Sequence, residues 1–129
     1  MTLDHAAALR ILLVDDHASF RETARHVLEQ EGCEIVGEAA SGEAAIAAAV
    51  STRPAVVLLD VGLADVDGFT VAAALAVAVP ATRVVLVSCR SLGDLGADRV
   101  AASGAVGFVP KDHLSRAAVE AVLAPPRAA

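Results

Sequence analysis

Residues 11–16, Ile-Leu-Leu-Val-Asp-Asp, place two adjacent carboxylates directly after four apolar side chains. A short, wholly apolar run that is rich in branched side chains is typical of a strand buried on both faces of a sheet. Comparable runs stand at residues 56–59 (Val-Val-Leu-Leu) and 84–87 (Val-Val-Leu-Val). We therefore expect three central strands, each followed at once by a polar residue.

Two weaker strand patterns lie at residues 34–38 and 106–109, and the first alternates with charge as an edge strand often does. The five strands begin at intervals of about 21 to 28 residues, which leaves room for one helix and two loops in each interval. Alternating strands and helices predict an α/β fold with a parallel sheet and helices on both faces.

Helical patterns occupy the gaps between these strands. The expected helices are one opened by a capping box at Ser19–Glu22 and stopped near Gly32, one from Ser41 to Val50, one over 69–78, one over 95–103, and one over 113–123 capped by Asp112. We expect a single domain at 9–123, an N-terminal tail at 1–8 and a C-terminal tail at 124–129.

The composition excludes several classes of protein. The chain has 129 residues, 56% of them hydrophobic, and a net charge of -6, which argues against a nucleic-acid surface. No apolar run approaches the ~20 residues of a membrane span, and the first residues lack the basic region of a secretory signal. Cys33 and Cys89 stand far apart, without the spacing of a zinc site or a disulfide scaffold. We expect a cytoplasmic protein with no membrane partner.

Polar residues follow four of the predicted strands. Asp15 and Asp16 follow the first strand, Asp60 the third and Ser88 the fourth, and Lys111 comes shortly after the fifth. With strand order 2-1-3-4-5, these side chains meet at the carboxyl edge of the sheet, where open α/β folds bind ligands. Clustered carboxylates repel one another, so we expect a hard divalent cation such as Mg²⁺ among them, helped by the lysine.

The chain resembles a response-regulator receiver domain of two-component signalling. The resemblance covers most of the chain and rests on residues 11–17, on 57–61 leading to Asp67-Gly68, on Val87-Ser88 and on 104–111. The last motif looks most like receivers joined to helix-turn-helix output domains. The resemblance implies a flavodoxin-like receiver fold with five parallel strands in the order 2-1-3-4-5.

The resemblance also implies roles for the residues at the strand ends. Asp60 would accept a phosphoryl group from a histidine kinase or a phosphotransfer protein. Asp16 would bind Mg²⁺ directly, Asp15 largely through water, and Gly62 through its backbone carbonyl. The phosphoryl group would contact Ser88 and Lys111, and a switch through Ser88 and Phe108 would reshape a face for a downstream protein. The chain would catalyse only its own phosphorylation and dephosphorylation, so it would not otherwise be an enzyme.

The sequence departs from the family pattern near the predicted site. Ala64 stands where most receivers have proline, which predicts a less rigid loop after Asp60. Cys89 follows Ser88 where a smaller residue is commoner, and we expect it to be packed. Arg90 and Gly62 stand at positions that tune phosphoryl lifetime in the family. The remaining polar residues nearby are expected to be ordinary surface groups: His17, Asp65, Asp67, Asp94 and Asp98.

Other functions remain open alternatives. A Mg²⁺-dependent phosphohydrolase with an aspartate nucleophile needs a second aspartate two positions later, where this chain has Gly62. A flavin- or nucleotide-binding module needs a phosphate loop after the first strand, where two aspartates stand instead. The output is either that of a stand-alone receiver, which we favour, or that of a DNA-binding regulator from which the receiver has been excised. A homodimer is a further option by analogy with the family.

Overall fold

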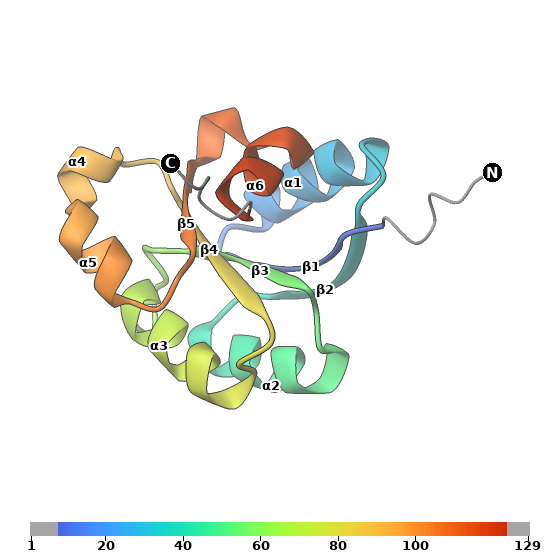
Figure 1. The fold of residues 1–129 in the computed structure, drawn as a ribbon. Coiled ribbons are helices and arrows are strands. Elements are labelled where there is room, and N and C mark those ends of the chain that lie inside the picture. Colours follow the sequence, from blue (N-terminus) through green and yellow to red (C-terminus); the bar gives the residue numbers. More distant parts are fainter. Residues whose placement is uncertain (1–7, 124–129) are drawn as a thin grey trace, which may run out of the picture.

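Five parallel strands form one sheet in the order β2-β1-β3-β4-β5, as predicted (Figure 1). The computed structural model describes residues 8–123, so the predicted tail at 124–129 and all but the last residue of the tail at 1–8 lie outside it. The strands are β1 (Arg10–Val14), β2 (Glu34–Ala39), β3 (Val56–Asp60), β4 (Arg83–Ser88) and β5 (Gly107–Pro110). Their parallel pairing brings all carboxyl ends to one edge.

The central strands are buried on both faces. Successive side chains of a strand point to opposite faces, so Leu12 and Val14 join one hydrophobic cluster while Ile11 and Leu13 join the other. All four of these side chains are at most 2% exposed. This double burial explains why β1 has an unbroken apolar run rather than an alternating one.

Helices cover both faces of the sheet (Figure 1). One face packs against α1 (Ala18–Gln30) and α6 (Arg116–Leu123), and the other against α2 (Gly42–Thr52) and α3 (Gly68–Ala78). Two short helices, α4 (Leu92–Leu95) and α5 (Ala97–Ala102), each add a buried side chain to the cluster beside α3. A 3₁₀ turn, η2 (Lys111–His113), follows β5.

The predicted capping box at Ser19–Glu22 is wrong. Helix α1 begins at Ala18 with His17 as its N-cap, and the His17 carbonyl accepts hydrogen bonds from the backbone N–H groups of Phe20 and Arg21. The His17 N–H in turn donates to Asp15 Oδ1 at 2.8 Å. The carboxylate of Asp15 therefore fixes the turn into the helix, which a local capping pattern does not reveal.

Two other predicted helices also differ from the structure. The expected helix at 95–103 is divided at Gly96, whose φ of +93° no helical residue adopts, into α4 and α5. The expected helix at 113–123 begins only at Arg116, because Leu114 is extended (φ −69°, ψ 127°). Its first turn is capped by Ser115, whose Oγ accepts a hydrogen bond from the Ala118 N–H, and not by Asp112.

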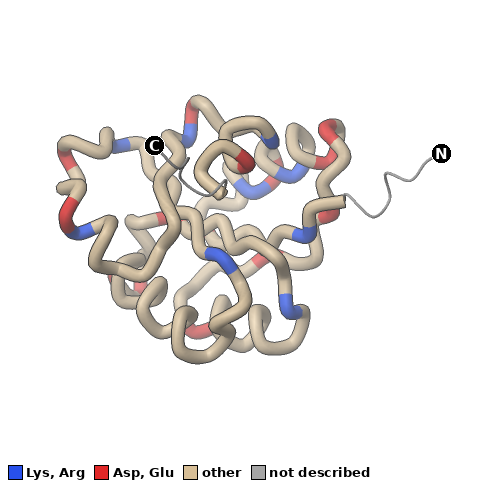
Figure 2. Tube along the Cα trace, in the orientation of Figure 1, with Lys and Arg blue, Asp and Glu red and all other residues tan. Residues whose placement is uncertain are grey.

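Charged residues are unevenly distributed between the pair α1 and α6 and the pair α2 and α3, which cover opposite faces of the sheet (Figure 2). Helix α3 contains no charged residue and α2 contains only Glu43, whereas α1 and α6 are rich in arginine and glutamate. Alanine occupies half of the exposed positions of α2 and α3. Within residues 8–123, no helix has the length and apolar character that crossing a membrane requires.

Candidate functional site

Three carboxylates meet at the carboxyl edge of the sheet. Asp15 and Asp16 follow β1, and Asp60 ends the neighbouring strand β3. Asp15 is 1% exposed and Asp60 is 4% exposed, while Asp16 is partly buried. One oxygen from each of these carboxylates and one ring nitrogen of His17 all lie within 4.8 Å of one another. The structure thus brings together the three carboxylates that the sequence predicted to converge.

Lys111 places a positive charge among these carboxylates. Its Nζ lies 2.5 Å from Asp15 Oδ2 and 3.6 Å from Asp60 Oδ1. The ammonium group also lies over the ring of Phe20, 4.5 Å from its centroid, a contact that the sequence did not predict. Because Lys111 is the first residue after β5, the sheet itself brings it to the same edge as Asp60.

Burial and charge change the acidity of the groups in this cluster. Burial, with the nearby Asp15 charge, raises the pKa of Asp60, although the Gly62 N–H and Lys111 act in the opposite direction. Burial by itself would lower the pKa of Lys111, but the close ion pair with Asp15 and the Asp60 charge outweigh it and raise that pKa. The raised pKa of Lys111 favours its charged form, and the raised pKa of Asp60 means that a further positive charge nearby would favour its ionised form.

The residues present fit a divalent cation with oxygen ligands. Asp15 Oδ2 and Asp16 Oδ1 are buried oxygens that accept no hydrogen bond of good geometry from any described residue. Lys111 Nζ and His17 Nδ1 lie near them, at 2.5 Å and 3.1 Å respectively, but only as ionic contacts. Buried carboxylate oxygens whose polar contacts are ionic ones of this kind are suitable ligands for a hard cation such as Mg²⁺.

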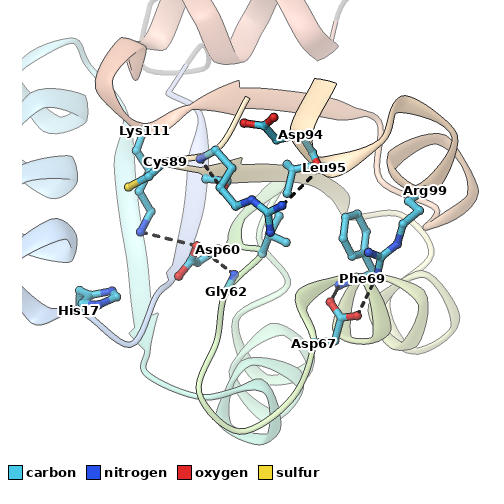
Figure 3. Close-up of a pocket in the computed structure, with 13 residues that line it drawn as sticks. His17, Asp60, Gly62, Asp67, Phe69, Cys89, Asp94, Leu95, Arg99 and Lys111 are labelled. Atoms are coloured by element: carbon cyan, nitrogen blue, oxygen red, sulfur yellow. Dashed lines mark hydrogen bonds and ion pairs between the residues drawn. The ribbon is translucent and has the colours of Figure 1, made fainter. Parts of the chain in front are cut away.

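A pocket of about 460 Å³ opens beside Asp60 (Figure 3). Ser88 lies on its wall and is 5% exposed, and its Oγ accepts a hydrogen bond from the Arg90 N–H at 3.0 Å. Cys89 lines the same pocket and is exposed, so our prediction that it is packed is wrong. It follows the last residue of β4, beyond the part of the strand that the helices cover.

Two aspartates expected to be ordinary surface groups hold the loop after Asp60. Asp67 caps α3, because its Oδ1 accepts a hydrogen bond from the Phe69 N–H at 3.0 Å. Asp65 accepts hydrogen bonds from the Gly42 N–H at the start of α2. An aspartate before Gly68 and an apolar run is an N-cap signal that could have identified Asp67. No local signal identifies Asp65, since its partner lies 23 positions away.

A second contact that the sequence did not reveal, between α5 and the start of α3, lies on the wall of the pocket. Arg99 of α5 lies over the ring of Phe69 at 4.3 Å and forms an ion pair with Asp67 at 3.2 Å (Figure 3). This contact joins α5 to the start of α3. Phe108, a predicted switch residue, is partly buried on β5 against the hydrophobic cluster on that same side.

His17 has a closer relation to the acidic pair than expected. Its ring is exposed at the start of α1, as predicted, but Nδ1 lies 3.0 Å from Asp15 Oδ1 and 3.1 Å from Asp16 Oδ1. The imidazole therefore contacts both Asp15 and Asp16, whereas the Lys111 ammonium contacts Asp15 and Asp60.

A flavodoxin-like sheet with an acidic cluster, a serine and a lysine at its carboxyl edge defines the class of receiver domains. Residues 11–123 match the family model described as the response regulator receiver domain, and the chain belongs to that family of two-component signalling proteins.

Similar proteins include regulators with further domains. The chain is 36% identical over 118 residues to a Pseudomonas aeruginosa protein named as a transcriptional regulator, covering 89% of this chain and 56% of that protein. It is 32% identical over 102 residues to a protein-glutamate methylesterase/protein-glutamine glutaminase of Hahella chejuensis, covering 78% of this chain and 29% of that protein. The chain therefore spans about half, or less, of the length of these relatives.

Solved structures show the same fold. The signal receiver domain of the response regulator NarL from Mycobacterium tuberculosis superposes with a TM-score of 0.79 at 35% identity, over 90% of this chain and 94% of that one. A LuxR-family response regulator from Aurantimonas sp. SI85-9A1 gives a TM-score of 0.81 at 29% identity, over 90% and 85% of the two chains.

Proposed function

We propose that this receiver accepts a phosphoryl group on Asp60 from a phosphohistidine of a histidine kinase or a phosphotransfer protein. The observation that carries the proposal is the position of Asp60. Its buried carboxylate faces an open pocket, with the Lys111 ammonium on one side and the Ser88 hydroxyl on the pocket wall. Phosphoryl transfer needs mainly positioning and charge neutralisation, and these residues supply both.

In the proposed transfer, an oxygen of Asp60 forms a bond to phosphorus as the bond from phosphorus to the donor histidine nitrogen breaks. Lys111, held by Asp15, would pair with a phosphoryl oxygen, and the Ser88 hydroxyl would donate a hydrogen bond to another. Mg²⁺, bound by Asp15, Asp16, Asp60 and the Gly62 carbonyl, would supply charge neutralisation of the phosphoryl oxygens. Water would later hydrolyse the aspartyl phosphate.

The proposed output is a change in the surface that includes β5. Phe108 lies on the strand next to β4, and β4 ends at Ser88. A shift of the Ser88 hydroxyl toward a phosphoryl group would free space for Phe108 to turn inward. The surface formed by α5, β5 and α6 would then bind a downstream protein differently in the two states.

Intact mass spectrometry tests the phosphorylation step. The purified chain is incubated with acetyl phosphate and MgCl₂, beside a sample with EDTA and an Asp60→Asn variant. We expect the mass of one phosphoryl group on the wild type, dependent on metal, and none on Asp60→Asn. A phosphorylated Asp60→Asn variant would show that Asp60 is not the acceptor.

Control of transcription is a second candidate output. It is favoured by the names of the relatives from Pseudomonas aeruginosa and Bacillus subtilis, which are transcriptional regulators about twice as long as the matched region. An antibody raised against residues 8–123 would measure the size of the protein in its native cells. A band near 13.0 kDa supports a stand-alone receiver, and a band near twice that mass supports a regulator with a further domain.

A further inference from the structure

We infer that Asp65 is a positioning residue, which holds the loop at 61–67 so that the Gly62 carbonyl can bind a divalent cation. The inference rests on the proposed function, because it takes the Gly62 carbonyl as a metal ligand. It goes further by assigning a role to Asp65, a residue outside the predicted site, and by naming a contact that restrains the loop in the absence of a proline.

Asp65 connects the loop directly to the start of α2. Both of its carboxylate oxygens lie 3.0 Å from the Gly42 backbone nitrogen, whose N–H they accept. This contact lowers the pKa of Asp65, as expected for a carboxylate at the positive end of a helix. The Ala44 N–H in the same turn donates instead to the local cap, Ser41 Oγ, at 3.1 Å. In the first turn of α2, one backbone N–H is thus bound by the helix's own cap, Ser41, and another by Asp65 of the loop.

The packing at Gly42 shows that the loop lies directly against this helix end. A Cβ at position 42 would overlap the side chain of Val66, in the loop, and would approach Val71 Cγ2 to 2.8 Å. Gly42 is itself buried. The absence of a side chain at this position lets the loop approach closely enough for Asp65 to reach the helix N–H.

Gly62 depends on its chain neighbours for its position. Apart from its two chain neighbours, no residue of the described part of the chain has an atom within 4 Å of where its Cβ would be, so no other side chain packs against that point. On one side, its N–H donates to Asp60 Oδ1 at 3.2 Å. On the other side, Leu63 is buried in the hydrophobic cluster beside α3, and two positions further on Asp65 contacts the start of α2. Loss of that contact would allow the Gly62 carbonyl more orientations, of which few are suitable for binding a cation.

Ala64 makes the contact at Asp65 more important. Alanine does not restrict φ as proline does, and among the described residues the Ala64 N–H donates no hydrogen bond. We predicted a less rigid loop from this residue alone. The contact at Asp65, one position further along the chain, adds a restraint on the loop to the packing of Leu63 and Val66 in the hydrophobic cluster.

Isothermal titration calorimetry with MgCl₂ tests the inference, since the chain has no tryptophan or tyrosine to report binding by fluorescence. We expect Asp65→Ala to weaken Mg²⁺ binding about fivefold. The loss of one helix cap changes a conformational equilibrium by about this factor, and Mg²⁺ affinity should fall with the population of the ordered loop. The matched control is Ser41→Ala, which removes the other cap of the same helix turn. Both variants should lower the unfolding midpoint similarly, but Ser41→Ala should bind Mg²⁺ as the wild type does.

Two further variants separate positioning from charge. Asp65→Asn retains an oxygen acceptor for the Gly42 N–H without the negative charge, and it should bind Mg²⁺ within about twofold of the wild type, because a neutral acceptor still caps a helix. An affinity as low as that of Asp65→Ala would mean that charge alone matters, and would overturn the inference. Adding Ala64→Pro to Asp65→Ala should recover part of the affinity, and a folded double variant with no recovery would contradict loop ordering as the route.

Calorimetry and the phosphorylation assay together distinguish failure of the proposed function from failure of the inference about Asp65. If the wild type binds no Mg²⁺ and acquires no phosphoryl group from acetyl phosphate, the proposed function fails and the inference fails with it. If the wild type does both and Asp65→Ala binds Mg²⁺ equally well, the inference alone fails.

Discussion

At the scale of a single residue, Asp60 should reduce the stability of the metal-free protein. Its pKa is raised by burial and by the Asp15 charge, so the ionised form is less favourable in the folded chain than in the unfolded one. We expect Asp60→Asn to raise the free energy of unfolding at pH 7 by about 1 kcal/mol. Thermal denaturation in EDTA, followed by circular dichroism, would show this as an increase of about 4 °C in the midpoint.

The sign of the pH dependence provides a check on this prediction. The pKa of Asp60 is higher in the folded chain than in the unfolded chain, where it is near 3.8. The free energy of unfolding therefore falls as the pH rises from the pKa of the unfolded chain through that of the folded chain. The advantage of Asp60→Asn should therefore be absent below that window and complete above it. Asp94→Asn, an exposed carboxylate in the same pocket, should leave the midpoint unchanged. An advantage of Asp60→Asn that is equal at all pH values would contradict this electrostatic origin.

At the scale of an element, Gly96 determines the division between α4 and α5. Its φ of +93° and ψ of 108° lie in a region that residues with a side chain rarely adopt. We expect Gly96→Ala to destabilise the chain by about 1–2 kcal/mol, because the junction must either accept strain or rearrange. Urea denaturation would measure the change, and amide hydrogen exchange would locate it in residues 92–102.

Gly93 provides a matched control within α4. It has no positive φ, and within residues 8–123 the nearest atom beyond its chain neighbours and its own helix backbone that a Cβ there would meet is Ser91 Oγ, at 3.7 Å. Alanine at this position should leave stability unchanged or raise it slightly, because alanine favours a helix over glycine. Equal losses in the two variants would mean that the backbone angle at Gly96 is not the cause.

At the scale of the whole molecule, Mg²⁺ should stabilise the fold. A ligand that binds only the folded state adds RT ln(1 + [L]/Kd), about 1.4 kcal/mol at ten times Kd. We expect the thermal midpoint to rise by about 5 °C at that concentration and to return to its starting value when EDTA is added. An Asp16→Asn variant should lose most of this response, since Asp16 Oδ1 is one of the two buried oxygens without a hydrogen bond. A response in that variant equal to the wild type's would exclude Asp16 as a ligand.

The sequence by itself determined the sheet and the residues at its carboxyl edge. Apolar runs such as 11–14 contain no polar residue that could face solvent. A strand with such a sequence is favourable when both of its faces are buried, as they are here. Once the strands were parallel, Asp15, Asp60 and Lys111 had to meet at one edge, because strand ends share that edge whatever the loops do. Their roles in binding metal and phosphate stay predictions that the proposed experiments test.

Only the tertiary structure decided how the loops and short helices are held. The start of α1 depends on the Asp15 carboxylate, and the loop after Asp60 depends on a helix N–H 23 positions away at Gly42. The ion pair between Arg99 and Asp67 likewise joins residues far apart in the chain. Each of these contacts contributes little energy and has no periodic pattern, so it forms only after the larger hydrophobic burial has brought its partners together.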